Sequence, residues 1–172
     1  MRELFVLDKK NYDPNGSVGR RPSVRGIIVR DGKIAMMHSA KYNYYKLPGG
    51  GIEGEETLTE TLIREVREES GLVVIPDTIK EFGYVRRIEK GRIDDIFIQD
   101  NYYFICEAED GVVAQDLDDY EADEQFELEF VSIDDAINVN ENADHYEKEE
   151  FGTFRGMIDR ENKVLLFFKE EL

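Results

Sequence analysis

Three glutamates near the middle of the chain have the spacing of a metal site on one face of a helix. Glu65, Glu68 and Glu69 stand at positions i, i+3 and i+4. On an α-helix these positions fall within an arc of about 100°, with Cβ atoms about 5–6 Å apart. At an effective dielectric constant of about 20, each ionised pair would repel by ~3 kcal/mol. A hard divalent cation removes this repulsion, and Mg²⁺ commonly combines a few carboxylates with the phosphates of a substrate.

The neighbouring residues predict the helix that must position these carboxylates. Thr57 followed by Glu60 has the pattern of a capping box, and Gly71 stands where a left-handed residue would end the helix. An apolar stripe lies beside the carboxylates and consists of Thr59, Leu62, Ile63 and Val66. We therefore expect one side of this helix to face the core and the adjoining side to face the metal.

The same segment resembles the Nudix box of the Nudix hydrolase superfamily. The pattern runs Gly50, five residues, Glu56, seven residues and then Arg64-Glu65-Val66-x-Glu68-Glu69-x-Gly71-Leu72, and it fills every defining position. The approach from Tyr45 to Gly50 is also similar to that of the family. Only Thr59-Glu60-Thr61 is unusual, and it touches no defining position. The resemblance implies an α/β fold, a Nudix-type α/β/α sandwich with a mixed β-sheet.

The activity implied by the resemblance is hydrolysis that depends on Mg²⁺ or Mn²⁺. The bond cleaved would be a phosphoanhydride in a nucleoside diphosphate linked to another moiety, such as a nucleoside triphosphate, an oxidised nucleotide or a nucleotide sugar. The alternative is a Nudix-like module that senses a nucleotide without turnover. Such relatives usually lose box glutamates, whereas this chain keeps all of them. The family's substrate markers are not found downstream of the box, so the substrate stays open.

The resemblance also assigns roles within the box. Glu65, Glu68 and Glu69 would hold the metal, and the carbonyl group of Gly49 or Gly50 would complete its shell. Arg64 lies about 100° around the helix from Glu65. We therefore expect Arg64 to orient a box carboxylate, Glu65 or Glu56, rather than to bind substrate.

The general base has several candidates, because family members use either a box glutamate or one in a later loop. Glu124 lies six residues before Phe130, which stands where many relatives have tryptophan ahead of the last strand. This spacing favours Glu124, with Glu127 as the second choice in the loop. Glu65 is the alternative within the box.

Substrate-binding residues are expected outside the box. Arg25, His38 and Tyr45 lie on the hairpin and loop that face the substrate in resembling enzymes, and Arg86 belongs to an isolated basic group with Arg87 and Lys90. Stacking is the role predicted for Tyr45, and phosphate contact is the role predicted for Arg25 or Arg86.

Composition favours one domain spanning residues 1–172. Its core would cover about residues 20–140, with an N-terminal strand and a C-terminal helix attached. The single cysteine, Cys106, allows no disulfide within the chain, and its strand-like setting predicts a buried structural thiol.

We see neither a secretory signal nor a membrane span, so we expect a cytoplasmic protein. The oligomeric state stays open, a homodimer included.

The net charge of −17 is concentrated in one block. Residues 94–147 contain 19 acidic residues and no lysine or arginine, which leaves 20 acidic and 22 basic residues elsewhere. Binding of a nucleic-acid backbone needs clustered cations, so the block argues against a nucleic-acid partner. It is compatible with a small nucleotide held through Mg²⁺.

The order of the remaining elements predicts an α/β alternation. We expect strands at residues 1–7, 79–89, 96–107 and 127–131, and a hairpin formed by residues 24–30 and 33–38 around Asp31-Gly32. Residues 42–51 and 109–123 are predicted as loops, the second because it is acidic and poor in apolar residues. A short helix at about residues 134–139, capped by Ser132, and a closing helix from about Glu149 complete the prediction.

Overall fold

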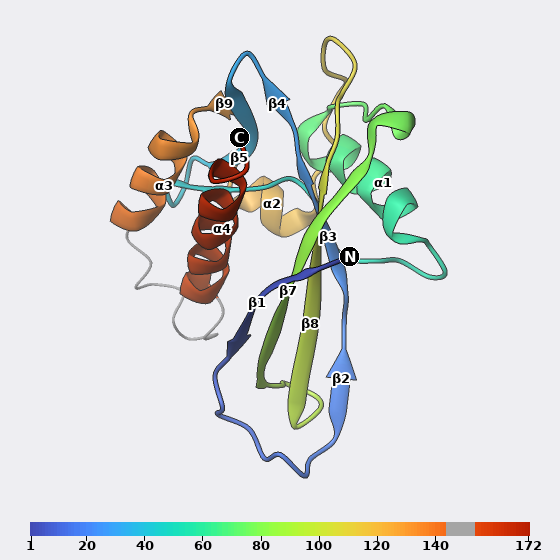
Figure 1. Cartoon of the computed structure of the whole chain (residues 1–172), viewed down its shortest axis with the longest axis vertical. Helices are drawn as coiled ribbons and strands as arrows, with labels where there is room; N and C mark the ends of the chain where they lie inside the picture. The colour runs from blue at the N-terminus through green and yellow to red at the C-terminus, as the bar shows by residue number, and fades with distance from the viewer. Residues whose placement is uncertain (144–153) are drawn as a thin grey trace.

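Two β-sheets lie between helices in the computed structural model, which describes residues 1–143 and 154–172 (Figure 1). The larger sheet is mixed. Its centre is the antiparallel pair β7 (Lys80–Lys90) and β8 (Ile96–Ile105). Strand β1 (Glu3–Asp8) runs parallel to β7, and β2 (Val18–Arg20) and β3 (Ser23–Ile27) both run parallel to β8. The strands predicted around residues 1–7, 79–89 and 96–107 are therefore confirmed.

The second sheet is built around β5 (Lys33–Ser39), which pairs antiparallel with β4 (Val29–Arg30), β6 (Tyr44–Lys46) and β9 (Phe126–Val131). The β4–β5 turn places Asp31 at φ 51° and Gly32 at φ 74°, as a two-residue hairpin turn requires. The predicted hairpin is wrong in its first half, because β3 joins the larger sheet. The chain changes sheets at Ile27 and Ile28, whose carbonyl groups accept the N–H groups of Cys106 and Ala35 at 3.1 and 2.8 Å.

One face of the sheets is covered by α1 (Leu58–Ser70), whose ends are those predicted. Thr57 Oγ1 accepts the N–H of Glu60 at 3.2 Å, Glu60 Oε2 accepts the N–H of Thr57 at 2.8 Å, and Gly71 ends the helix at φ 73°. The helix packs on β3, where a Cβ atom on Gly26 would lie 2.9 Å from a methyl group of Val66. This close approach buries the apolar stripe and leaves the box carboxylates at its edge.

The opposite face is covered by α3 (Ile133–Asn142) and α4 (Phe154–Lys169), so the layers are those of an α/β/α sandwich (Figure 1). Ser132 caps α3 as predicted, with its hydroxyl group accepting the N–H of Asp135 at 3.1 Å. Helix α4 contributes Val164, Leu165 and Phe168 to the core. The predicted start of the closing helix near Glu149 lies outside the described residues.

Two segments predicted as loops contain regular structure instead. Residues 42–51 include β6, and residues 109–123 include the short helix α2 (Asp119–Asp123). Both segments are held by buried ionic contacts between residues far apart in the sequence, as described below, and local composition does not reveal such contacts. Two further short elements, β2 and the 3₁₀ turn at Pro76–Thr78, were not expected.

Within the part of the chain that the structure describes, no helix is both long enough and apolar enough to cross a membrane.

Cys106, just after β8, provides a test of the core. Its side chain is buried, with 3% of the residue exposed, and burial raises the pKa of its thiol to about 12. Because the thiolate is the reactive form, an aromatic disulfide reagent at pH 8 should react at least about a hundredfold more slowly with the native protein than with protein unfolded in guanidinium. Fast, complete labelling of the native protein would contradict the predicted packing around β8.

Candidate active site

Arg64 is the centre of the carboxylate cluster on α1. Its Nε and Nη2 atoms donate to the two oxygens of Glu56 at 2.7 and 2.8 Å, and its Nη1 donates to Glu65 at 2.9 Å and to Glu68 at 3.0 Å. Its Nη2 also donates to the carbonyl group of Gly51 at 3.1 Å. These contacts are those of a residue that orients carboxylates, which is the role expected for Arg64.

The same guanidinium group sets the protonation of its partners. Its paired hydrogen bonds lower the pKa of Glu56 to about 2. Burial raises the pKa of Glu65, and Arg64 opposes this rise. Bidentate, charge-assisted hydrogen bonds of this kind are among the stronger ones in proteins. Arg64 thus allows three glutamates to lie close together without full mutual repulsion.

The glycine loop before α1 fits closely around two of the carboxylates. A Cβ atom on Gly50 would lie 2.2 Å from Glu65 Oε2. Gly49 has φ 139°, in the range that favours glycine, and its N–H donates to Glu69 Oε2 at 2.8 Å. A side chain at Gly50 would displace the Glu65 carboxylate, and one at Gly49 would collide with the backbone of Val24. Both glycines are therefore required by the local packing of the site.

Lys46 on β6 forms a second, buried centre. Only 4% of the residue is exposed, and its Nζ lies 2.7 Å from Glu69 Oε1 and 2.9 Å from Glu121 Oε1. Nζ also lies 4.5 Å from the centre of the Phe126 ring. Burial raises the pKa of Glu69 to about 8, Lys46 opposes the increase, and the adjoining Glu121 carboxylate adds to it. One lysine thus joins β6, α1 and α2.

The donor set fits a divalent cation. Among the described residues, five carboxylates, those of residues 56, 65, 68, 69 and 121, form ion pairs with two cations, Arg64 and Lys46. Five minus two leaves a formal excess of three negative charges, or of two while Glu69, whose pKa is raised to about 8, holds a proton. Arg64 uses one oxygen each of Glu65 and Glu68. In the described residues, no three acidic or histidine side chains already stand in chelating geometry. The oxygen-rich set with surplus negative charge nevertheless has the chemistry that Mg²⁺ prefers.

Of the two predicted loop carbonyls, that of Gly50 already accepts the N–H of Val24 at 2.9 Å. Among the described residues, the Gly49 carbonyl accepts no hydrogen bond. Gly49 is therefore the better placed of the two for the metal shell, which stays a prediction.

The later glutamate that reaches the box is Glu121, which sequence reasoning missed. Glu124, favoured from its spacing, is buried instead, and its Oε2 accepts the hydroxyl group of Tyr44 at 2.7 Å. Glu127 is exposed on β9. A local signal was present: Asp118 followed by Glu121 has capping spacing, and the N–H of Asp118 donates to Glu121 Oε2 at 3.2 Å. The start of α2 was missed because residues 109–123 were expected to form an unpacked acidic loop.

Three of the four predicted substrate residues lie away from the box carboxylates. Tyr45 follows strand alternation and points to the face opposite Lys46, where its hydroxyl group donates to Glu129 Oε2 at 2.7 Å. His38 stacks on Tyr45 with ring centres 4.6 Å apart and pairs with Glu129 at 2.8 Å. Arg86 forms a bidentate pair with Asp100 at 2.7 and 2.9 Å. The prediction that these side chains face a substrate at the box therefore receives no support from the geometry.

Arg25 is the fourth predicted substrate residue, and it is close enough to act on the site. Its positive charge lowers the pKa of both Glu65 and Glu69, against the larger effect of burial. Its Nη1 donates to the carbonyl group of Val24 at 2.7 Å, whereas its Nε is buried and has no hydrogen-bond partner among the described residues. A cation so placed remains suited to an anionic substrate.

The chain matches a known family and several known proteins. The family model described as NUDIX domain matches residues 19–151. An RNA pyrophosphohydrolase of Halorhodospira halophila is 42% identical over 73 residues, which are 41% of this chain and 39% of that protein. An ADP-ribose pyrophosphatase of Methanocaldococcus jannaschii is 44% identical over 55 residues, 30% of this chain and 32% of that protein. The chain thus spans well under half the length of these two relatives.

Solved structures support the fold. A mutator MutT protein from Bacillus halodurans superposes with a TM-score of 0.55 at 18% identity, covering 69% of this chain and 72% of that one. At this identity the likeness concerns the fold alone.

Replacing Lys46 tests the buried centre. Lys46→Met leaves Glu69 and Glu121 as adjacent buried carboxylates without a cation, so the free energy of unfolding should fall by about 3–5 kcal/mol in urea denaturation. Lys41→Met is the matched control, because Lys41 pairs with Asp123 at the same 2.7 Å but at the surface; it should change stability by less than about 1 kcal/mol.

Adding Glu121→Gln to Lys46→Met should recover part of the lost stability, because one of the two buried carboxylates that have lost their cation is then removed. Equal effects of Lys46→Met and Lys41→Met would show that the buried centre does not stabilise the fold.

Proposed function

This chain belongs to the NUDIX domain family, and we propose that it is a pyrophosphohydrolase that cleaves a phosphoanhydride in a nucleoside diphosphate linked to another moiety. The observation that carries the proposal is the convergence of Glu65, Glu68 and Glu69 on one edge of α1, with Arg64 and the glycine loop holding them in place. The names of the two relatives, both acting on pyrophosphate bonds, are in keeping with it.

The expected ion is Mg²⁺ or Mn²⁺, held by Glu65, Glu68 and Glu69 with the Gly49 or Gly50 carbonyl group. When bound, it would supply charge neutralisation at the phosphoryl oxygens and activation of water. The protein's own contributions are distinct. Arg64 fixes the direction of the carboxylates, and Arg25 offers positive charge to a substrate phosphate.

The reaction needs a proton acceptor. The oxygen of water forms a bond to phosphorus, the anhydride P–O bond breaks, the leaving phosphate oxygen takes the electron pair, and a proton of the water passes to a carboxylate. Glu121 is our candidate acceptor, because it comes from α2 and lies within the Lys46–Glu69 network. Glu121 and Glu124 are both buried, but Glu124 is less well supported, since its carboxylate accepts the Tyr44 hydroxyl group, whereas that of Glu121 pairs with Lys46 beside Glu69. Glu65 is the alternative within the box.

A small nucleotide is the proposed substrate class. One relative is named for RNA and the other for ADP-ribose, so both need consideration. A long phosphate backbone needs an extended row of cations, which a chain of net charge −17 does not favour. The cytoplasmic location and the oligomeric state stay predictions from the sequence.

A substrate screen tests the proposal directly. Nucleoside triphosphates, oxidised nucleotides, nucleotide sugars, ADP-ribose and dinucleoside polyphosphates would be incubated with the protein and Mg²⁺, and release of phosphate or pyrophosphate would be measured. Hydrolysis of at least one class supports the proposal. Tight binding without turnover would favour the alternative, a nucleotide-sensing module.

The box carboxylates should be required for turnover. Glu68→Gln removes a charge from the proposed metal set, so turnover should fall at least about a hundredfold while the circular dichroism spectrum is unchanged. Chelation of divalent cations should abolish the activity of the parental protein. Glu55→Gln, an exposed position in the loop before the helix, is the matched control and should have parental turnover. Near-parental turnover of Glu68→Gln would refute the metal assignment.

Glu121 on α2 and Glu124, the residue after α2, should differ in their effect on turnover. If Glu121 accepts the proton, Glu121→Gln should lower turnover about a hundredfold or more and remove the rising limb of the pH profile. Glu124→Gln should stay within about threefold of parental turnover and keep that limb. The reverse pattern would assign the role to Glu124, and an unchanged profile in both variants would leave Glu65 as the acceptor.

A further inference from the structure

A second region of the molecule is strongly basic. A cavity of about 570 Å³ lies where the end of β1, β2 and the β7–β8 hairpin meet. Six basic residues line this cavity: Lys9, Arg20, Arg21, Arg87, Lys90 and Arg92. Among the described residues, the acidic ones along it are Glu89 and Asp94. Six cations and two anions leave an excess of four positive charges, within a chain whose net charge is −17.

The buried Glu89 carboxylate does not remove the excess positive charge of the cavity. Glu89 is buried, with Oε2 at 2.6 Å from Lys9 Nζ and Oε1 at 3.6 Å from Arg87 Nη2. Arg87 Nε is buried and has no hydrogen-bond partner among the described residues. Burial lowers the pKa of Arg87, Glu89 opposes this, and the charges of Arg160 and Arg25 lower it further. An anion in the cavity would offset these repulsions.

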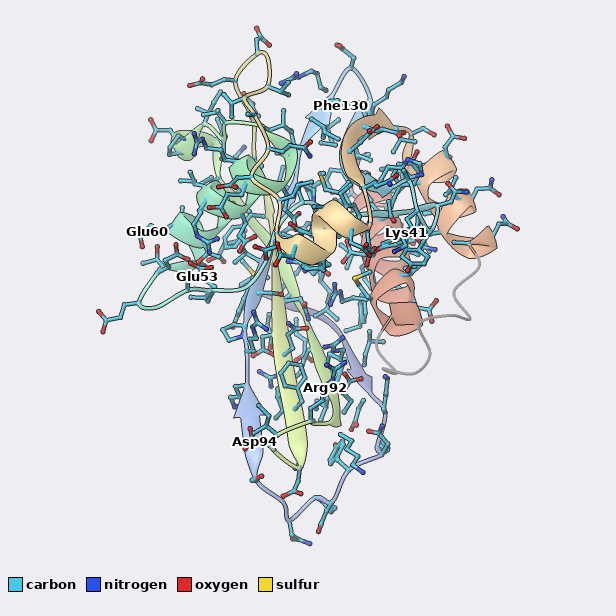
Figure 2. The ribbon with its side chains drawn as sticks, turned by 180° about the vertical axis from the view of Figure 1, so that it is seen from behind. Lys41, Glu53, Glu60, Arg92, Asp94 and Phe130 are labelled. Carbon is cyan, nitrogen blue, oxygen red and sulfur yellow. The ribbon has the colours of Figure 1, made fainter. Side chains whose placement is uncertain are left out.

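The cavity adjoins the box across a single residue. A Cβ atom on Gly51 would lie 3.3 Å from the Arg21 guanidinium group, on the cavity side. The carbonyl group of the same Gly51 accepts Arg64 Nη2 at 3.1 Å, on the carboxylate side. Arg25 acts on both regions, since its charge affects Glu65 and also Arg87. Figure 2 shows the hairpin end of this region, with Arg92 and Asp94 labelled, and the loop before α1 with Glu53.

We propose that this cavity binds a phosphate group of the substrate that is separate from the anhydride being cleaved. The preferred substrates would then be pyrophosphate compounds whose organic moiety carries a further phosphomonoester. This inference rests on the proposed function and narrows its substrate class.

The dimensions and chemistry of the cavity favour a phosphate on a small molecule. A volume of about 570 Å³ is typical of a small-ligand site. Guanidinium groups match phosphate oxygens with paired hydrogen bonds, and four of the six cations are arginines, on β2, the segment after β2, β7 and the β7–β8 turn. The Phe97 ring, 5.5 Å from the Arg87 guanidinium carbon, adds an apolar surface for the organic part.

Matched substrate pairs test the proposal. ADP-ribose would be compared with its 2′-phosphate, and dephospho-coenzyme A with coenzyme A, because the members of each pair differ by one phosphomonoester. At least one phosphorylated member should have a kcat/KM about tenfold or more above its partner, mainly through a lower KM. Equal kcat/KM values within both pairs would overturn the cavity assignment while leaving the hydrolase assignment intact.

Variants connect the preference to the cavity. In the double variant Arg21→Gln with Lys90→Gln, the ratio of kcat/KM values within the preferred pair should fall from about ten or more to near one. Lys33→Gln removes one positive charge at the start of β5, away from the cavity lining, and should keep the parental ratio. An unchanged ratio in the double variant would show that the preference arises elsewhere, which contradicts the proposal.

A binding measurement separates this proposal from the hydrolase assignment. Adenosine 2′,5′-bisphosphate and adenosine 3′,5′-bisphosphate would be titrated calorimetrically against AMP, each with Mg²⁺. At least one bisphosphate should bind about tenfold more tightly than AMP in the parental protein and lose this advantage in the double variant. If no compound of the substrate screen and neither substrate pair is hydrolysed but this pattern is found, the hydrolase assignment fails and the cavity assignment stands. No advantage of either bisphosphate would overturn the cavity assignment.

Discussion

The site depends on two cations that hold five carboxylates together. Arg64 joins Glu56, Glu65 and Glu68 from within α1 and its preceding loop, and Lys46 joins Glu69 to Glu121 across three segments. Each cation is outnumbered by its acidic partners, so the cluster keeps a negative charge that a divalent cation could meet. These carboxylates therefore do not form an ordinary solvated face of a surface helix. The fold holds them close together despite their mutual repulsion.

The architecture brings the parts of this cluster from opposite directions. The apolar stripe of α1 packs on β3 and fixes the distance of α1 from the sheet, with Gly26 allowing close contact. Strand β6 directs Lys46 to one face and Tyr45 to the other, so adjacent residues serve different layers. Helix α2 then covers the buried end with Glu121. The α3–α4 layer completes the core, and none of the carboxylates bound by Arg64 or Lys46 comes from it.

Sequence reasoning was strongest where the information is local. The capping box at Thr57, the left-handed Gly71 and the two strands β7 and β8 all depend on neighbouring residues, and each was predicted. The Lys46–Glu69–Glu121 contacts join residues 23 and 75 positions apart, and no local pattern reports such a pairing. Strand alternation could have separated Tyr45 from Lys46, but β6 is only three residues long and was hidden in a glycine-rich loop. Likewise, the change of sheet after Ile27 depends on hydrogen bonds between this segment and strands distant in the sequence, which no local pattern reports.

The hairpin between β7 and β8 contributes Lys90, Arg92 and Asp94 to the basic cavity and none of the carboxylates bound by Arg64 or Lys46. Gly51 lies between the two regions as fixed backbone. The hairpin end can therefore change in sequence and length without disturbing the packing of the box helix. In evolutionary terms, a fold of this kind separates the residues that select a molecule from those that act on it, so a new preference can arise without a new catalyst.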